Sequence, residues 1–129
     1  MTNTRRHAGF TLIELLIVVV IIGILVAVAI PKFSETRGKA YASSLKSDLK
    51  NLGTQQELYF YSNRTYSSSL MAVNMTASPG VILAITEASP NGWSATTTHP
   101  SADPVVCAVF YGNASPVAPA TNQGAIKCQ

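Results

Sequence analysis

The longest apolar run in the chain, Phe10–Ile30, holds sixteen Phe, Leu, Ile or Val residues and one charged residue, Glu14. In an α-helix, 21 residues span about 31 Å, which matches the hydrocarbon core of a bilayer. The apolar side chains lower the free energy of membrane insertion by more than a carboxylate near one end of the helix raises it. The run therefore predicts a membrane-spanning helix. Arg5 and Arg6 precede it and predict a cytoplasmic N-terminus with the remainder exported.

A cleaved secretory signal peptide is the alternative interpretation of the same run. Ala27-Val28-Ala29 has the small-x-small pattern of a signal-peptidase site. However, the apolar run is too long for a signal peptide, and Glu14 has no purpose in one. An ionisable side chain inside a membrane span indicates a functional site, so a retained helix is favoured.

The helical pattern continues beyond the membrane segment. Pro31 lies inside it, removes one backbone hydrogen bond and is expected to kink the helix. Further on, one helical face carries Leu45, Leu49, Leu52, Gln56 and Tyr59. These positions predict one helix from about Phe10 to about Ser62, with a membrane-spanning half (10–30) and an amphipathic half (31–62).

The composition changes after Asn63, where six of the seven prolines lie among Ser, Thr, Ala and Asn. Residues 65–78 are expected to form a connecting loop within a globular head, 63–129. Alternating or β-branched runs predict strands at Gly80–Ala88, Trp93–His99, Val105–Tyr111 and, more briefly, Ala125–Cys128. Pro90-Asn91-Gly92 predicts a hairpin turn. The predicted fold is α+β, with the long helix packed on a small antiparallel sheet through Leu49, Leu52 and Tyr59.

Charge and candidate chemistry narrow the function classes. At 129 residues, the chain has room for one small domain and an anchor. Its net charge of +3 rests partly on the two N-terminal arginines, so no specific nucleic-acid partner is predicted. His7 and His99 belong to no catalytic set, and Glu87 with Asp103 are too few for a calcium site. We therefore expect no enzyme activity, cofactor or metal.

Two cysteines, Cys107 and Cys128, both lie in the exported portion. Exported compartments are oxidising, which predicts a disulfide that closes the C-terminal loop. Closing such a loop stabilises the domain by about 3 kcal/mol in the chain-entropy model. A metal site is a poor alternative because no His lies nearby at ligand spacing.

The N-terminal residues form a recognisable pattern. Arg5-Arg6, then Gly9-Phe10-Thr11-Leu12-Ile13-Glu14 and the unbroken apolar run resemble the processing site of type IV prepilins and related pseudopilins. The resemblance implies that a prepilin peptidase removes the leader, residues 1–9, by cleaving between Gly9 and Phe10, and methylates the new Phe10 amine. A disulfide-closed C-terminal loop also resembles the variable region of many type IV pilins.

The same resemblance implies a structural subunit, most like a major type IVa pilin, that leaves the bacterial inner membrane to form an extracellular homopolymer. Its partners would be its own copies, prepilin peptidase and the pilus assembly machinery, with adhesion, motility or DNA uptake as filament functions. Glu14 is expected to neutralise the Phe10 ammonium of a neighbouring copy, whereas snorkelling to the headgroups would suffice in a monomer. The alternatives are a pseudopilin of type II secretion, weakly disfavoured because no acidic calcium loop is evident, and a minor pilin that binds DNA or a surface.

Overall fold

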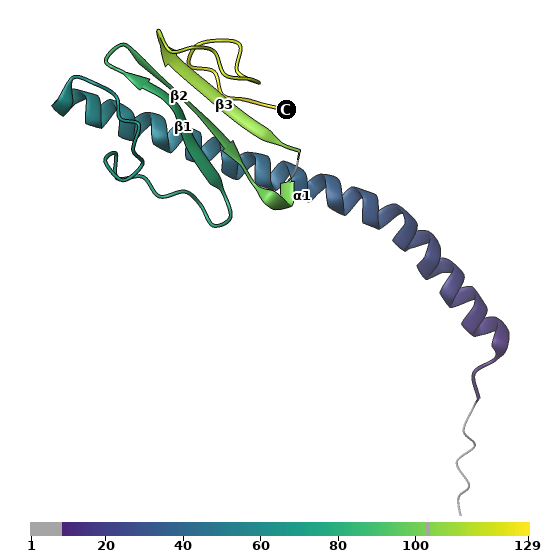
Figure 1. The fold of residues 1–129 in the computed structure, drawn as a ribbon. Helices are drawn as coiled ribbons and strands as arrows, with labels where there is room; N and C mark the ends of the chain where they lie inside the picture. The colour runs from purple at the N-terminus through teal and green to yellow at the C-terminus, as the bar shows by residue number, and fades with distance from the viewer. Residues whose placement is uncertain (1–8, 103) are drawn as a thin grey trace, which may run out of the picture. The chain divides into compact units, whose positions relative to one another are not determined.

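The computed structural model describes residues 9–102 and 104–129 (Figure 1). Its elements, in chain order, are α1 (Leu12–Asn63), β1 (Ile82–Ser89), β2 (Gly92–Thr98), the short 3₁₀ helix η1 (Pro100–Ala102), β3 (Val106–Gly112) and β4 (Lys127–Cys128). The architecture is α+β, as the sequence predicts. Residues 1–8 of the expected leader, including Arg5 and Arg6, lie outside the described residues.

Contacts divide the chain into two units, one ending at Thr36 and the other spanning Arg37–Gln129. In the first unit, α1 is long and apolar enough to cross a membrane. Its large apolar side chains between Leu12 and Ile30 are between 43% and 82% exposed. Pro31 lies within the helix, and the kink expected there stays a prediction.

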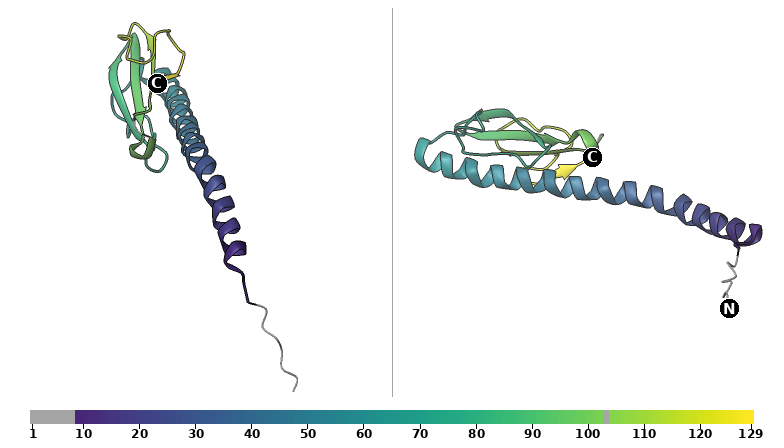
Figure 2. Two further views of the ribbon diagram at one scale, coloured as in Figure 1. Left: turned by 90° about the vertical axis from the view of Figure 1, so that its right-hand side faces the viewer. Right: turned by 90° about the horizontal axis from the view of Figure 1, so that it is seen from below.

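In the second unit, the sheet lies along one side of the C-terminal half of α1 (Figure 2). Leu45, Leu49 and Leu52 of the helix are at most 1% exposed and pack against Trp93 and Val109 of the sheet. The amphipathic face predicted from helical spacing is confirmed. Its last member, Tyr59, is partly buried at the margin of this core.

The sheet has the order β1-β2-β3-β4, and every neighbouring pair is antiparallel. Ser89 pairs with Gly92, so Pro90 and Asn91 form a two-residue hairpin turn where it was predicted. Each strand begins within two residues of its predicted start. The first begins at Ile82 rather than Gly80 because the Val81 amide donates to the Ser78 carbonyl in a preceding turn, at 2.9 Å.

A connecting loop over 65–78 is also observed, and two buried polar side chains of α1 hold it. Gln56 donates to the Ser67 carbonyl at 2.7 Å and accepts from the Ser67 amide at 2.9 Å. Asp48 accepts from both the amide and the hydroxyl of Ser78, each at 2.8 Å. Both helix side chains are nearly inaccessible to solvent. Burial of polar groups is tolerated here because each has its hydrogen-bond partners.

The start of this loop is also held by an aromatic contact. Tyr66 stacks on Phe60 with ring centroids 4.7 Å apart, and its hydroxyl donates to the Glu57 carboxylate at 3.0 Å. Partial burial raises the pKa of Tyr66 above its ordinary value, and the Glu57 carboxylate raises that pKa further. The loop is thus fastened to α1 near both of its ends.

Candidate functional site

Glu14 lies in the first turn of α1, where it closes a reciprocal hydrogen-bonded cap with Thr11. The carboxylate accepts from the Thr11 amide at 2.8 Å and from the Thr11 hydroxyl at 2.7 Å. The Glu14 amide donates to the Thr11 hydroxyl oxygen at 3.3 Å. This is a capping box, which satisfies amides that would otherwise lack partners at the start of a helix. It explains why α1 begins at Leu12 rather than at Phe10.

Thr11 positions the Glu14 carboxylate, although the site residues predicted from the sequence do not include it. The signal was available, because Thr11 and Glu14 have the Ser/Thr-x-x-Glu spacing of a capping box immediately before an apolar run. The cap holds the carboxylate over the first helical turn. A carboxylate has about four acceptor positions, so the bonds to Thr11 leave it able to accept further hydrogen bonds.

Gly9 and Phe10, the residues on either side of the expected cleavage bond, are both exposed, with Phe10 at 73%. A Cβ atom built on Gly9 would meet nothing within 4 Å. The fold of the chain itself therefore has room for a side chain at this position. If glycine is required at position 9, the requirement comes from another molecule, such as an enzyme that cleaves the Gly9–Phe10 bond.

The apolar surface of α1 between Leu12 and Ile30 is the largest exposed apolar surface of the described chain. Full burial of one Leu, Ile or Val side chain is worth about 1.5–3 kcal/mol. Fifteen such side chains, each about half exposed or more, represent a driving force on the order of ten kcal/mol or greater. This surface requires lipid or other protein to cover it.

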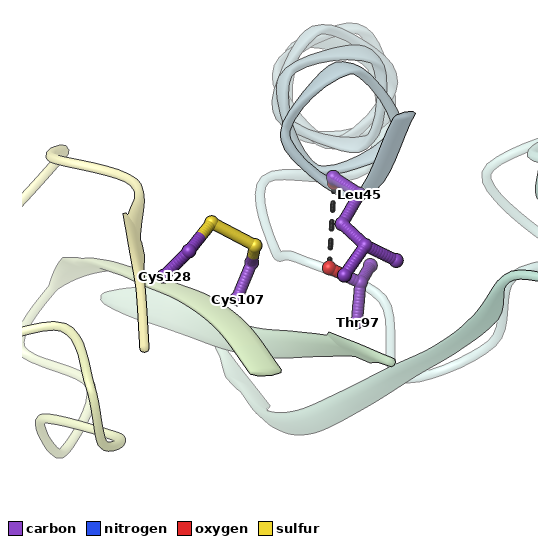
Figure 3. The surroundings of a disulfide bond; sticks show 4 residues. All are labelled: Leu45, Thr97, Cys107 and Cys128. Carbon is purple, nitrogen blue, oxygen red and sulfur yellow. Dashed lines mark hydrogen bonds between the residues drawn. A yellow bond between two sulfur atoms is a disulfide. The ribbon is translucent and has the colours of Figure 1, made fainter. Parts of the chain in front are cut away.

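The predicted disulfide between Cys107 and Cys128 is confirmed. The two cysteines are paired across β3 and β4, and their bond lies on the side of the sheet that faces α1 (Figure 3). Nearby, the Thr97 hydroxyl donates to the Leu45 carbonyl of the helix at 3.3 Å. The disulfide thus fastens the end of the chain to the sheet beside the helix–sheet core.

Comparison of the sequence with known proteins identifies the family of this chain. The prokaryotic N-terminal methylation motif matches residues 4–30, which include Gly9, Phe10 and Glu14. Over 62 residues the chain is 50% identical to the type IV major pilin protein PilA of Myxococcus xanthus, covering 48% of this chain and 28% of that protein. Over 99 residues it is 36% identical to the type IV wide pilus major component PilA4 of Thermus thermophilus, covering 74% of this chain and 76% of that protein. This chain belongs to the type IV pilin family.

The pilin is also similar to core proteins of the type II secretion system. It is 37% identical over 65 residues to the type II secretion system core protein G of Pseudomonas aeruginosa, covering 50% of the pilin and 46% of that protein. The Thermus match covers 74% of the pilin, so it has to extend from the helix into the sheet. The pilin spans about a quarter of the length of the Myxococcus relative and less than half of the Pseudomonas one.

Proposed function

We propose that this pilin is a non-enzymatic structural subunit that polymerises through α1 into an extracellular type IV pilus. One observation carries the proposal: an apolar helix that its own chain leaves exposed continues into a head with a well-packed core. A subunit of this kind is anchored in a bilayer before assembly and is covered by other copies afterwards. The similarity to a pilus major component over both helix and head supports the same function.

Maturation by prepilin peptidase is part of the proposal. The enzyme cleaves between Gly9 and Phe10 and methylates the Phe10 amine. The methylation motif over residues 4–30 and the open surroundings of Gly9 support this step. Before cleavage the pilin spans the inner membrane once, with Arg5 and Arg6 in the cytoplasm.

Glu14 has the assembly role in this proposal. Its carboxylate neutralises the ammonium of a processed Phe10, and the partner ammonium belongs to a neighbouring copy. The exposure of the carboxylate supports this role, because it keeps acceptor positions beyond its bonds to Thr11 and can accept from an ammonium of another copy. A charge pair in a surface of low dielectric constant attracts strongly and restricts how two helices are shifted along each other.

A pseudopilin of type II secretion is the second candidate, favoured by the similarity to core protein G over half of the chain. Deletion of the gene followed by complementation separates the two functions. Under our proposal, electron microscopy finds surface filaments that disappear with the gene and whose main protein is this chain. Loss of enzyme secretion, with no filament in the parent strain, would instead establish the pseudopilin function.

A further inference from the structure

Beyond the expected leader, the chain has two methionines, Met71 and Met75, and both lie in the connecting loop. Their side chains are exposed to very different extents. Met71 is 89% exposed, the highest value among the large apolar side chains of the described residues. Met75 is partly buried and packs against the core of the head. The loop thus presents one thioether to solvent and covers the other.

Hydrogen bonds within the loop hold this arrangement. The Met75 amide donates to the Leu70 carbonyl at 2.9 Å, and the Asn74 amide donates to the Met71 carbonyl at 3.0 Å. Asn74 has a φ of 52°, in the left-handed region that asparagine adopts more readily than most residues. Leu70 and Val73 pack in the core, whereas Met71 lies on the outer side of the same turn.

The other oxidation-prone side chains of the head are protected. Cys107 and Cys128 are joined in the disulfide, and none of the described cysteines is free. Trp93 is fully buried beneath the sheet and α1. Oxidation of a side chain requires access of the oxidant to it, so exposure selects the sulfur of Met71.

We propose that Met71 is a site of oxidation by hydroperoxides and that the head keeps its fold when this residue is oxidised. The Met71 Sδ atom attacks one peroxide oxygen, the O–O bond breaks, and a sulfoxide forms. The sulfur loses two electrons and the peroxide gains them, so hydrogen peroxide leaves as one water molecule. The proposal concerns the head alone and does not rest on the proposed function.

The position of Met71 explains why the fold is kept. Its sulfoxide oxygen lies in water, because the side chain is almost fully exposed. A sulfoxide at Met75 lies against the apolar core instead, where a polar group without a partner destabilises the head. Oxidation at Met71 thus turns the most exposed apolar side chain of the head into a polar one.

Limited oxidation with hydrogen peroxide tests the proposal. The chain is purified from membranes in detergent without reductant, treated for increasing times and digested. Fragmentation spectra then assign each added oxygen to Met71 or Met75. We expect oxidation at Met71 to proceed at least about tenfold faster than at Met75, because access of the oxidant limits the reaction. A ratio of rates near one, or faster oxidation of Met75, would overturn the proposal.

Two matched variants verify the assignment. Met71→Leu removes the sulfur and keeps an apolar side chain of similar size. The early gain of one oxygen should disappear from the peptide that carries both positions, and the rate at Met75 should be unchanged. Met75→Leu is the control and should keep the early gain. Early oxidation of that peptide in Met71→Leu would overturn the assignment, because another group would then be the reactive one.

Thermal unfolding of the head distinguishes a surface reaction from damage to the core. Fluorescence of Trp93, which is buried in that core, reports the unfolding midpoint. The midpoint should be unchanged after oxidation of Met71 alone and should fall once Met75 is also oxidised. A lowered midpoint after oxidation of Met71 alone would contradict the inference that the head keeps its fold.

Discussion

The two halves of α1 have the same secondary structure but differ in where their apolar side chains are covered. The N-terminal half leaves them exposed within the chain, whereas the C-terminal half buries its main apolar face. Between Leu12 and Ile30, apolar side chains surround the helix and all remain exposed within the chain. Between Arg37 and Asn63, the buried apolar side chains Leu45, Leu49 and Leu52 lie on one face, which the sheet of the same chain covers. An apolar stripe predicts a partner within the chain, whereas an apolar surface on every side predicts lipid or other copies.

The two acidic residues Glu14 and Asp48 repeat the contrast. Asp48 is buried, and its bonds to Ser78 join elements 30 residues apart. Glu14 is exposed and bonds only three residues away, to Thr11. The Asp48 carboxylate holds the connecting loop on α1, whereas the Glu14 carboxylate caps the exposed N-terminal end of α1. Substitutions at these two sites should therefore affect different properties.

The largest effect is expected at the cleavage site. Gly9→Val should leave full-length precursor in the membrane and abolish filaments, because the peptidase has to accommodate the residue before the cleaved bond. Intact-mass analysis checks this, since the parental protein should lack Met1–Gly9 and carry one added methyl. Gly23→Val is the control, because Gly23 is equally open in the structure and lies away from the bond. Normal maturation of Gly9→Val would contradict the processing proposal.

Glu14→Gln tests the role of charge while keeping the helix cap. Glutamine can replace glutamate in a capping box, so membrane insertion and cleavage should be unchanged. Loss of one partner of a buried charge pair costs about 3–5 kcal/mol, so mature subunits should accumulate in the membrane with few filaments. Filament counts by electron microscopy and subunit levels by immunoblot measure this.

Thr11→Val supplies the matched control for Glu14→Gln. It removes the hydroxyl of the cap and keeps the charge, so it should assemble better than Glu14→Gln. If Glu14→Gln forms filaments of normal number and length, the pairing of Glu14 with Phe10 is wrong, although family membership is unaffected. The two variants thus separate what the exposed carboxylate does for its own helix from what it does for a neighbour.

Loss of the disulfide should act through the stability of the head. Cys128→Ser should lower the free energy of unfolding of the head by about 3 kcal/mol and reduce filament yield without altering cleavage at Gly9. Fluorescence of Trp93, the one tryptophan, reports this unfolding because it is fully buried in the head core. An unchanged unfolding midpoint would show that pairing across β3 and β4 holds the C-terminus without the bond.

A substitution of Asp48, which binds Ser78 of the connecting loop, should lower the stability of the head by less than loss of the disulfide does. Asp48→Asn can keep both bonds to Ser78, because the amide oxygen accepts from the Ser78 amide and the amide nitrogen donates to the Ser78 hydroxyl oxygen. The variant then loses only the strengthening of these bonds by charge, about 1 kcal/mol. Thermal unfolding followed by Trp93 fluorescence measures the loss. Filaments should still form near the parental level, in contrast to Glu14→Gln. Equal assembly defects in both variants would refute the division of roles between the two carboxylates.

Most of the helix, the strands and the disulfide could be predicted because they depend on local periodicity and on residue type. Helical spacing is enough to group Leu45, Leu49 and Leu52, and the turn residues Pro90 and Asn91 mark the hairpin. The contacts that fasten the loop could not be predicted in this way. Asp48 and Gln56 meet partners 30 and 11 residues away, and no local pattern indicates which polar groups a folded chain brings together.

The capping box at the start of α1 has a local sequence signal, whereas the β-bulge in β1 has none. The Thr11–Glu14 cap was predictable from its spacing, but the prediction for Glu14 concerned only its charge, as a partner of the Phe10 ammonium of a neighbouring copy. The register of β1 against β2 shifts between Ile85 and Glu87, where Thr86 and Ser94 bring their hydroxyl oxygens to 2.7 Å. A β-bulge of this kind depends on the pairing of two strands rather than on one run of residues.

The smallest expected effect concerns the pH dependence of the head. Burial and Glu57 raise the pKa of Tyr66 above 10.0, so the folded head keeps this proton at a pH where the unfolded chain loses it. By linkage, the resulting stability is present below pH 10 and is lost as pH rises through the folded pKa. Tyr66→Phe keeps the ring that stacks on Phe60 and removes the titrating group. Its thermal midpoint, read from Trp93 fluorescence, should therefore fall less steeply above pH 10 than that of the parental pilin. Parallel declines in the two proteins would mean that Tyr66 titrates alike in the folded and unfolded chain.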